Sequence, residues 1–338
     1  MKARVEPRIE LTGRTALQEV IPLQSPMILF VDPSSACNFQ CTFCPTGDRD
    51  LIKGTGRFQG RMGLDLFNKL MTDINDFPVP LKVLRLYKDG EPLLNKELPT
   101  FISLARQSEK IEFIDTTTNA SLLSPAISEK LIAAGLDKIN ISIDGMTTQQ
   151  YQDFTGYRMD MKELVANVKW FYDHRDQCEV VCKIPGDLIT ERQQEEFYET
   201  FGDICDRIFI ENFAPCWPRF DIEERTGVKI TEGIYQQPIG DTDTCPYIFY
   251  AMSVNADGHV SSCFLDWERK LIVGDANQDH LLSIWTSDTF DSLRIQHLSG
   301  RRRENPVCGN CGQLSHCLPD NIDPYREDIL RRYQLPVV

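Results

Sequence analysis

Three cysteines on one short segment form the strongest chemical feature of the sequence. They are Cys37, Cys41 and Cys44, with spacings of four and then three residues. Thiolates are the preferred ligands of iron–sulfur clusters, and a [4Fe–4S] cube normally takes four of them. Three thiolates on one loop would therefore leave one iron open for chemistry. Because two to four residues between cysteines also suit tetrahedral zinc, a zinc knuckle is the alternative.

The segment Tyr87–Pro92 is a second chemical feature, and it reads Tyr-Lys-Asp-Gly-Glu-Pro. In this segment Gly90 allows a close approach of the backbone to a ligand, and Pro92 fixes the exit of the turn. The carboxylate of Glu91 is suited to receive an ammonium group. By itself, the segment is equally typical of an ordinary turn between a strand and a helix.

The cysteine run resembles the signature of the radical S-adenosylmethionine (SAM) superfamily. In that family the open iron chelates SAM, and an electron from the cluster cleaves SAM to methionine and a 5′-deoxyadenosyl radical. The second segment resembles the family's Gly-Gly-Glu-Pro motif, which holds the methionine end of SAM. Asp89 replaces the first glycine, so three of the four motif residues match. The resemblance implies a SAM-binding [4Fe–4S] cluster on Cys37, Cys41 and Cys44.

Polar residues at two later strand ends complete the SAM site that this resemblance implies. The runs Thr116–Asn119 and Ser142–Gly145 follow the third and fourth expected strands, and family members contact the adenosyl part of SAM from these strands. The implied SAM-binding residues are Phe43, Asp89, Gly90, Glu91, Thr118, Asn119, Ser142 and Asp144. For Thr118, Asn119 and Asp144, a helix cap or turn is an equally good interpretation.

A second group of cysteines lies towards the C-terminus. Cys245 and Cys263 flank a predicted hairpin turn at 255–258. A C-x2-C-x5-C pattern follows, made of Cys308, Cys311 and Cys317. The arrangement resembles the SPASM or twitch extension of radical SAM proteins. Five candidate ligands cannot fill two cubes of four, so the resemblance implies one auxiliary [4Fe–4S] cluster on Cys245, Cys263 and two of the other three. A zinc ribbon is the alternative.

The stretch from 27 to 213 alternates short β-rich runs with helical segments. The expected strands are 27–32, 82–87, 111–117, 138–144, 179–184 and 207–211. The expected helices are 64–74, 98–107, 126–134, 161–174 and 191–201. Such alternation predicts a parallel α/β sheet, as a barrel or as an open doubly wound sheet. The resemblance implies a partial (β/α)6 TIM-type barrel, with its chemistry at the carboxyl ends of the strands.

The expected domain order follows from the change of pattern after 215. It comprises an N-terminal extension (1–26), a core barrel (27–215), a linker that closes the barrel (216–243) and an auxiliary-cluster domain with a C-terminal tail (244–338), built from a β-hairpin and helices.

One further cysteine is a candidate catalytic residue. Cys216 follows the sixth expected strand, where barrel active sites gather. A thiol has a weak S–H bond, so Cys216 is suited to give a hydrogen atom to a carbon radical. The alternative is a small buried hydrophobic residue. Lys183 and Glu211, near the ends of late strands, are expected to bind polar substrate groups or to solvate the rim.

Composition limits the partners and the compartment. The 338-residue chain has a net charge of −14, which disfavours nucleic-acid binding. We find neither an apolar run of the roughly 18 residues that span a bilayer nor the apolar segment of a signal peptide. Twelve cysteines in such a chain favour metal sites in a reducing compartment over disulfides. We therefore expect a cytoplasmic protein that binds neither nucleic acid nor membranes.

The sequence leaves several functions open. The first hypothesis is a radical SAM oxidoreductase that abstracts hydrogen from a carbinol carbon of a small sugar or aminocyclitol and yields a ketone. It implies a flavodoxin- or ferredoxin-type electron donor, and the oligomeric state is not predicted. An epimerase that uses a cysteine hydrogen donor is one alternative, and a peptide-modifying maturase is another. The non-enzymatic alternative is an electron-transfer or zinc-binding protein.

Overall fold

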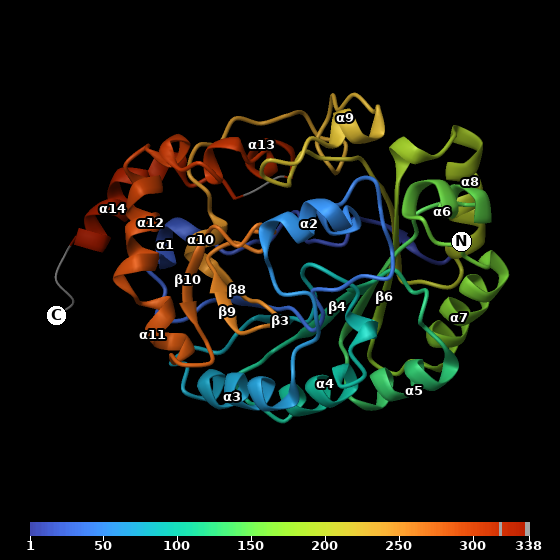
Figure 1. The fold of residues 1–338 in the computed structure, drawn as a ribbon, viewed down its shortest axis with the longest axis horizontal. Coiled ribbons are helices and arrows are strands. Elements are labelled where there is room, and N and C mark those ends of the chain that lie inside the picture. The colour runs from blue at the N-terminus through green and yellow to red at the C-terminus, as the bar shows by residue number, and fades with distance from the viewer. Residues whose placement is uncertain (318–319, 335–338) are drawn as a thin grey trace.

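A ten-stranded sheet runs through the centre of the computed structural model, which describes residues 1–317 and 320–334 (Figure 1). Residues 318–319 and 335–338 of the expected C-terminal domain lie outside the described residues. The strand order is β1-β7-β6-β5-β4-β3-β2-β8-β9-β10. The strands are β1 (Arg4–Val5), β2 (Ile28–Val31), β3 (Val83–Arg85), β4 (Ile114–Thr118), β5 (Lys138–Ser142), β6 (Glu179–Pro185), β7 (Arg207–Glu211), β8 (Ala251–Val254), β9 (His259–Ser261) and β10 (Ile272–Asp275).

The six predicted strands are present as β2 to β7, and they pair in parallel in the order of the sequence. Residues from all six strands line one cavity, which requires the sheet to curl around it. An open doubly wound sheet would present its strands to two separate faces instead. The core is therefore the partial TIM-type barrel that the resemblance implied, and the prediction of an α/β fold is confirmed.

Helices cover the outside of this curved sheet. In the view of Figure 1, α3, α4 and α5 lie below the sheet and α2, α9 and α13 above it. The helices up to β7 are α1 (Leu17–Val20), α2 (Arg49–Thr55), α3 (Leu64–Asn75), α4 (Leu98–Arg106), α5 (Pro125–Ala133), α6 (Thr148–Thr155), α7 (Met161–His174) and α8 (Glu191–Phe201). Those that follow are α9 (Ile222–Thr226), α10 (Tyr247–Tyr250), α11 (Leu281–Trp285), α12 (Asp288–Leu298), α13 (Gln313–His316) and α14 (Arg326–Gln334).

The five predicted helices are present as α3, α4, α5, α7 and α8, and local signals explain two of their starts. The Ser124 side chain accepts a hydrogen bond from the Ile127 N–H, and Pro125 occupies the first helical position of α5. Thr190 forms a capping box with Gln193 at the start of α8. Short α2 and α6 were not predicted, because neither carries a long apolar period.

Two strands outside the predicted barrel extend its sheet at both ends. β1, from the N-terminal extension, pairs in parallel with β7. β8 pairs in parallel with β2 over four residues, from Ile28 opposite Ala251 to Val31 opposite Val254. The predicted hairpin of β8 and β9 is present, and its turn places Gly258 at φ +94°. One continuous sheet therefore joins the core to the segment that carries the later cysteines.

Apolar side chains of the strands form much of the buried core. Leu84, Ile139, Ile141 and Val254 are fully buried strand residues. Among the described residues, no helix combines the length and apolarity that crossing a membrane requires.

The shared sheet predicts that the barrel and the C-terminal hairpin unfold together. Met252 of β8 is buried at 1% exposure, so Met252→Ala should cost about 2–5 kcal/mol. The whole chain should then lose structure in one transition at lower urea concentration. Far-UV circular dichroism and tryptophan fluorescence, recorded in parallel, should give coincident curves. Val79→Ala, at an exposed position, is the matched control and should change stability by less than about 0.5 kcal/mol. Two separated transitions would contradict the prediction.

Candidate active site

The loop after β2 carries Cys37, Cys41 and Cys44, whose three thiols line one cavity. Backbone hydrogen bonds fix this loop against the end of α6, with Gln40 N donating to Thr155 O at 2.7 Å. Within the loop, Cys44 N donates to Cys41 O at 3.2 Å. The three predicted cluster ligands are therefore held on a stiff backbone at the carboxyl end of a barrel strand.

Burial determines the protonation of these thiols. It raises the pKa of Cys37 to about 12 and also raises the pKa of Cys41 and of Cys44. For Cys41, the neighbouring Asp144 and the other two thiols raise the pKa further. Because metal ligation needs thiolates, the negative charge on these sulfurs must be compensated by the iron that they bind. The donor set fits a cluster with three thiolate ligands.

The Asp89–Glu91 turn packs directly on the cysteine loop. A Cβ atom added at Gly90 would lie 2.1 Å from Ala36 O and 2.4 Å from Ser34 O, which only glycine avoids. The Glu91 N–H donates to the same Ala36 O at 3.0 Å. The two sequence motifs, the cysteine run and the Asp89–Glu91 turn, are therefore in direct backbone contact.

The Glu91 carboxylate is buried and ties two strand ends together. It accepts hydrogen bonds from Thr118 Oγ1 at 2.6 Å, Asn119 N at 2.8 Å and Leu93 N at 3.0 Å. Burial nevertheless raises the pKa of Glu91 above its ordinary value. A carboxylate offers about four acceptor positions. Three are occupied, so one remains for the ammonium group that the sequence assigned to Glu91.

The other predicted SAM-binding residues line the same cavity. Ser142 and Asp144 face it from the end of β5, and burial raises the pKa of Asp144 to about 7. Asn119 Nδ2 donates to Asn38 Oδ1 at 3.1 Å, so Asn119 also supports the cysteine loop. Phe43 packs on Phe213 with ring centroids 5.2 Å apart. Geometry thus brings the whole predicted set together around the cysteine triplet.

Thr117 was not predicted as a ligand, although it lies in the same cavity wall. Its Oγ1 is buried and has no hydrogen-bond partner within the described protein, so it is available to a ligand. The sequence offered a signal in the Thr116-Thr117-Thr118 run. Strand alternation alone did not decide which of the three hydroxyls points inward.

The later cysteines separate into two groups. Burial raises the pKa of Cys245, and the neighbouring thiols Cys308 and Cys311 raise it further. For Cys263, burial, Cys245 and Cys311 act in the same direction. Charge interactions thus link Cys245, Cys263, Cys308 and Cys311 in pairs, and four is the number of thiolates that a cube normally takes.

Cys317 differs from these four thiols because it lines the cavity that contains the cysteine triplet. Burial raises its pKa, and the thiols of Cys216 and Cys311 raise it further. Cys216 and Cys317 both line the cavity that contains the cysteine triplet. The sequence left open which of Cys308, Cys311 and Cys317 is not a ligand, and this geometry favours Cys317. The candidate hydrogen donor Cys216 thus has a second thiol beside it.

A charged group in the barrel includes one residue that sequence reasoning missed. Arg8, from the N-terminal extension, donates through Nε to Glu211 Oε1 at 3.0 Å, and Lys183 Nζ lies 3.2 Å from Glu211 Oε2. Although burial raises the pKa of Glu211, Lys183 and Arg8 together lower it below its ordinary value. Lys183 and Glu211 are paired inside the barrel instead of solvating its rim. No local signal marked Arg8, which reaches this site across about 200 residues of sequence.

Comparison with known proteins identifies the class. The model of the radical SAM superfamily matches residues 31–203, and the model of an iron–sulfur cluster-binding domain, SPASM, matches residues 245–312. The chain therefore belongs to the radical SAM superfamily. Within that class it is an enzyme that combines a radical SAM domain with a SPASM domain.

Two curated relatives carry a specific name. The chain is 33% identical to GTP 3′,8-cyclase of Xanthomonas campestris pv. campestris (strain B100), over 80% of this chain and 90% of that protein. It is also 33% identical to a probable GTP 3′,8-cyclase of Metallosphaera sedula, over 42% of this chain and 41% of that protein. The second match thus spans about two fifths of each protein.

Solved structures support the fold. BtrN in complex with AdoMet and 2-DOIA matches with a TM-score of 0.55 and 18% identity, over 85% of this chain and 93% of that chain. Native anSMEcpe with bound AdoMet matches with a TM-score of 0.58 and 16% identity, over 91% and 96%. With the two domain matches, these findings confirm a SAM-binding [4Fe–4S] cluster and an auxiliary iron–sulfur cluster, and decide both sites against zinc.

Iron content should separate the cysteines by role. We expect about eight iron atoms in anaerobically reconstituted protein, as two [4Fe–4S] clusters. Replacing the whole triplet by alanine should remove about half of the iron and all SAM cleavage. Cys308→Ala with Cys311→Ala should remove the other half. Cys317→Ala is the matched control and should keep all of it. Iron loss in the Cys317 variant equal to that of the double variant would place Cys317 among the ligands.

Glu91→Gln should weaken SAM binding about five- to tenfold. A charge-assisted hydrogen bond to the ammonium group becomes a neutral one of roughly half the strength, a loss of about 1 kcal/mol. Isothermal titration of SAM into the reconstituted protein measures the change. Thr118→Val removes one donor to Glu91 but keeps its charge, so its SAM affinity should fall less. If Glu91→Gln binds SAM as tightly as the parent protein does, Glu91 has only a turn-forming role.

Proposed function

We propose that this radical SAM enzyme is an oxidoreductase that abstracts hydrogen from a carbinol carbon of a small polyhydroxylated substrate, such as a sugar or an aminocyclitol, and yields a ketone. The observation that carries the proposal is a single cavity of about 880 Å³. It reaches from the cysteine triplet to Cys216 and Cys317, and Cys311 of the auxiliary group acts on both of these thiols. A substrate bound between the two cysteine groups would have both clusters as neighbours.

The lining of the cavity supports a small polar substrate. Phe30 and Phe264 stack with centroids 4.6 Å apart and form an apolar wall. Arg8, Tyr235 and Gln313 add hydrogen-bonding groups to the lining. Flat apolar walls with a few polar groups are typical of small-molecule sites, and the polar groups fix the orientation of the ligand.

The chain's own residues have distinct parts in the proposed reaction. When bound, the SAM-binding cluster supplies the electron that cleaves SAM, and the auxiliary cluster supplies a one-electron acceptor. Glu91 and the strand-end residues orient SAM, while Arg8, held by Glu211, orients a substrate hydroxyl. The buried cavity keeps water from the substrate radical. An external flavodoxin or ferredoxin is proposed as the electron donor.

GTP 3′,8-cyclisation is a second candidate, which the 33% identity to the Xanthomonas cyclase favours. The charges of the cavity favour the first candidate, the oxidation of a neutral polyol. Arg8 pairs with Glu211 at 3.0 Å, and Arg207 pairs with Glu10 at 2.8 Å. Arg14 is likewise paired with an acidic side chain. A triphosphate would have to displace these carboxylates to reach its countercharges, whereas a neutral polyol would not.

Epimerisation of the same substrates is the third candidate, because Cys216 and Cys317 line the cavity. An epimerase must return a hydrogen atom to the substrate radical, and a thiol has the weak S–H bond for it. A dehydrogenase instead passes an electron to an acceptor. The two reactions share the first abstraction and differ in its quenching.

Incubation in D2O with Cys216→Ser separates the candidates. We expect the variant to make 5′-deoxyadenosine and ketone within a few-fold of the parent rate, without solvent deuterium in the product. Removing the auxiliary ligands with Cys308→Ala and Cys311→Ala should abolish the ketone. Product analysis by mass spectrometry, with sugars, aminocyclitols and GTP as parallel substrates, gives the readout. Solvent deuterium in the parent's product, lost in Cys216→Ser, would establish the epimerase. Turnover of GTP alone would establish the cyclase.

A further inference from the structure

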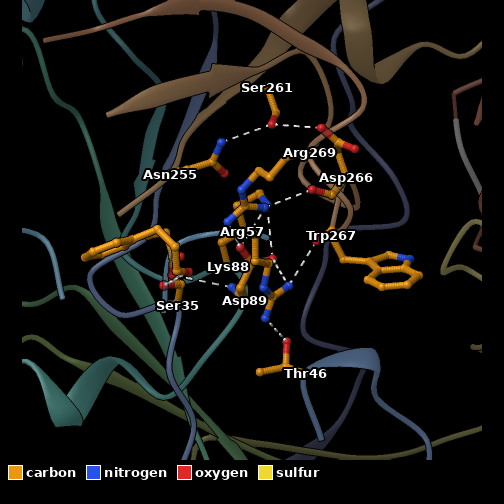
Figure 2. Close-up of polar contacts among 12 residues, drawn as sticks. Ser35, Thr46, Arg57, Lys88, Asp89, Asn255, Ser261, Asp266, Trp267 and Arg269 are labelled. Atoms are coloured by element: carbon orange, nitrogen blue, oxygen red, sulfur yellow. Dashed lines mark hydrogen bonds and ion pairs between the residues drawn. The ribbon is translucent and has the colours of Figure 1, made fainter. Parts of the chain in front are cut away.

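Asp89, the residue that replaces a glycine of the family motif, is the centre of a buried ion cluster (Figure 2). Lys88 Nζ lies 3.1 and 3.2 Å from its two carboxylate oxygens, and Arg57 Nη1 lies 3.7 Å away. Arg269 Nη2 donates to the other side of the carboxylate. These four residues are called the Asp89 cluster below.

The Asp89 cluster excludes water almost completely. The side chains of Arg57 and Lys88 are 0% exposed, that of Asp89 is 1% exposed and that of Arg269 is 11% exposed. Although burial raises the pKa of the carboxyl group, the three cations around it hold the pKa below its ordinary value. Three cations therefore face the Asp89 carboxylate in a region where charges interact strongly. A second buried carboxyl group lies beside it, because Asp32 Oδ1 accepts a hydrogen bond from the Asp89 N–H at 3.4 Å. Burial and the charge of Asp89 raise the pKa of Asp32 to about 7.

Arg57 links this cluster to the SAM-binding loop. Its Nη2 donates to Thr46 Oγ1 at 2.8 Å, two residues beyond Cys44. This hydrogen bond holds the positive charge of the Arg57 guanidinium against the segment that directly follows the cysteine triplet.

Arg57 and Arg269 also link the cluster to the loop between β9 and β10, which contains Cys263. Arg57 Nη1 donates to Trp267 O at 3.2 Å, and Arg269 Nη1 donates to Asp266 O at 2.9 Å. The Asp266 carboxylate accepts a hydrogen bond from Ser261 Oγ at 3.0 Å (Figure 2). It also accepts one from the Leu271 N–H at 2.9 Å, and the two hydrogen bonds fix the turn. In the same loop, the backbone of Arg269 adopts a positive φ of +62°. Such a backbone conformation persists only where the surroundings enforce it.

We propose that the Asp89 cluster is a positioning device that holds the loop between β9 and β10, which carries Cys263, against the SAM-binding loop. The charges of the Asp89 cluster also set the reduction potential of the SAM-binding iron–sulfur cluster. Reduction adds one negative charge to that cluster, so nearby cations stabilise the reduced form. Asp89 offsets part of this effect. The replacement of the motif's glycine by aspartate thereby acquires a role that does not depend on which substrate the enzyme oxidises.

The charge part of the proposal predicts shifts of opposite sign. Asp89→Asn removes a negative charge and should raise the midpoint potential of the SAM-binding cluster. Arg57→Gln removes a positive charge and should lower it. Combining both substitutions restores the charge balance and should return the potential towards that of the parent. Redox titration of the reconstituted full chain, followed by electron paramagnetic resonance with and without SAM, measures all three.

Asp115→Asn is the matched control. Asp115 is also a buried aspartate, with 1% of its side chain exposed. Its carboxylate lies 3.4 Å from the guanidinium of Arg85, and neither residue belongs to the Asp89 cluster. Its substitution should leave the potential unchanged. A purely structural role of the Asp89 cluster would lower the unfolding temperature in each variant without opposite potential shifts. Shifts of the same sign, or none at all, in iron-replete variants would overturn the charge role.

The positioning part is tested by a double-mutant cycle on the unfolding temperature. Asp89→Asn and Arg269→Gln should each lower it, and the combined variant should lose less than the sum, because the two residues share one contact. Additive losses would overturn the positioning role. If Asp89→Asn does not fold, Arg57→Gln and Arg269→Gln carry the test. Both must then lower the potential, and an unchanged or raised value in either would overturn the proposal.

Discussion

The close contact between two backbones is the constraint on which the active site depends. The turn at Gly90 lies so near the cysteine loop that a side chain there would overlap Ala36 O at 2.1 Å. The backbone N–H of Glu91 donates a hydrogen bond to that loop, and the Glu91 carboxylate accepts hydrogen bonds from residues at the end of β4. Because the thiols and the carboxylate share one rigid support, the cluster and the methionine end of SAM are positioned by the same contact. A flexible connection between them would lose this geometry.

Continuity of the sheet connects the segment that carries the second cysteine group to the barrel core. β8 pairs with β2, the strand that leads into the cysteine triplet, so the C-terminal hairpin has a fixed register against the core. Of the four grouped auxiliary thiols, Cys311 acts on both Cys216 and Cys317, which line the cavity. A linker between independent domains would leave the separation of the two clusters variable. A shared sheet makes it a property of the fold.

The charges of the molecule have a different distribution inside and outside. The chain carries a net charge of −14, yet arginines such as Arg8 and Arg207 reach into the barrel, where acidic partners neutralise them. Pairing of this kind is what buried charges require, since an unpaired ion inside a protein is costly. The Asp89 cluster has three cations around the Asp89 carboxylate, with the buried Asp32 carboxyl group beside it. Its links to the loop that carries the cysteine triplet run through the Gly90 turn and through the hydrogen bond from Arg57 to Thr46.

The sequence by itself determined the features that are local in the chain. The cysteine spacings, the Gly90–Pro92 turn and the alternation of apolar runs specified the class, both metal sites and the six core strands, because each of these patterns is set within a few residues. Only the tertiary structure decided how distant segments meet: β1 and β8 at the ends of the barrel, Arg8 beside Glu211, Cys317 beside Cys216, and Arg269 on Asp89. Those contacts join residues about 100 to 220 positions apart. They depend on packing and charge pairing in three dimensions, for which a linear pattern carries no signal.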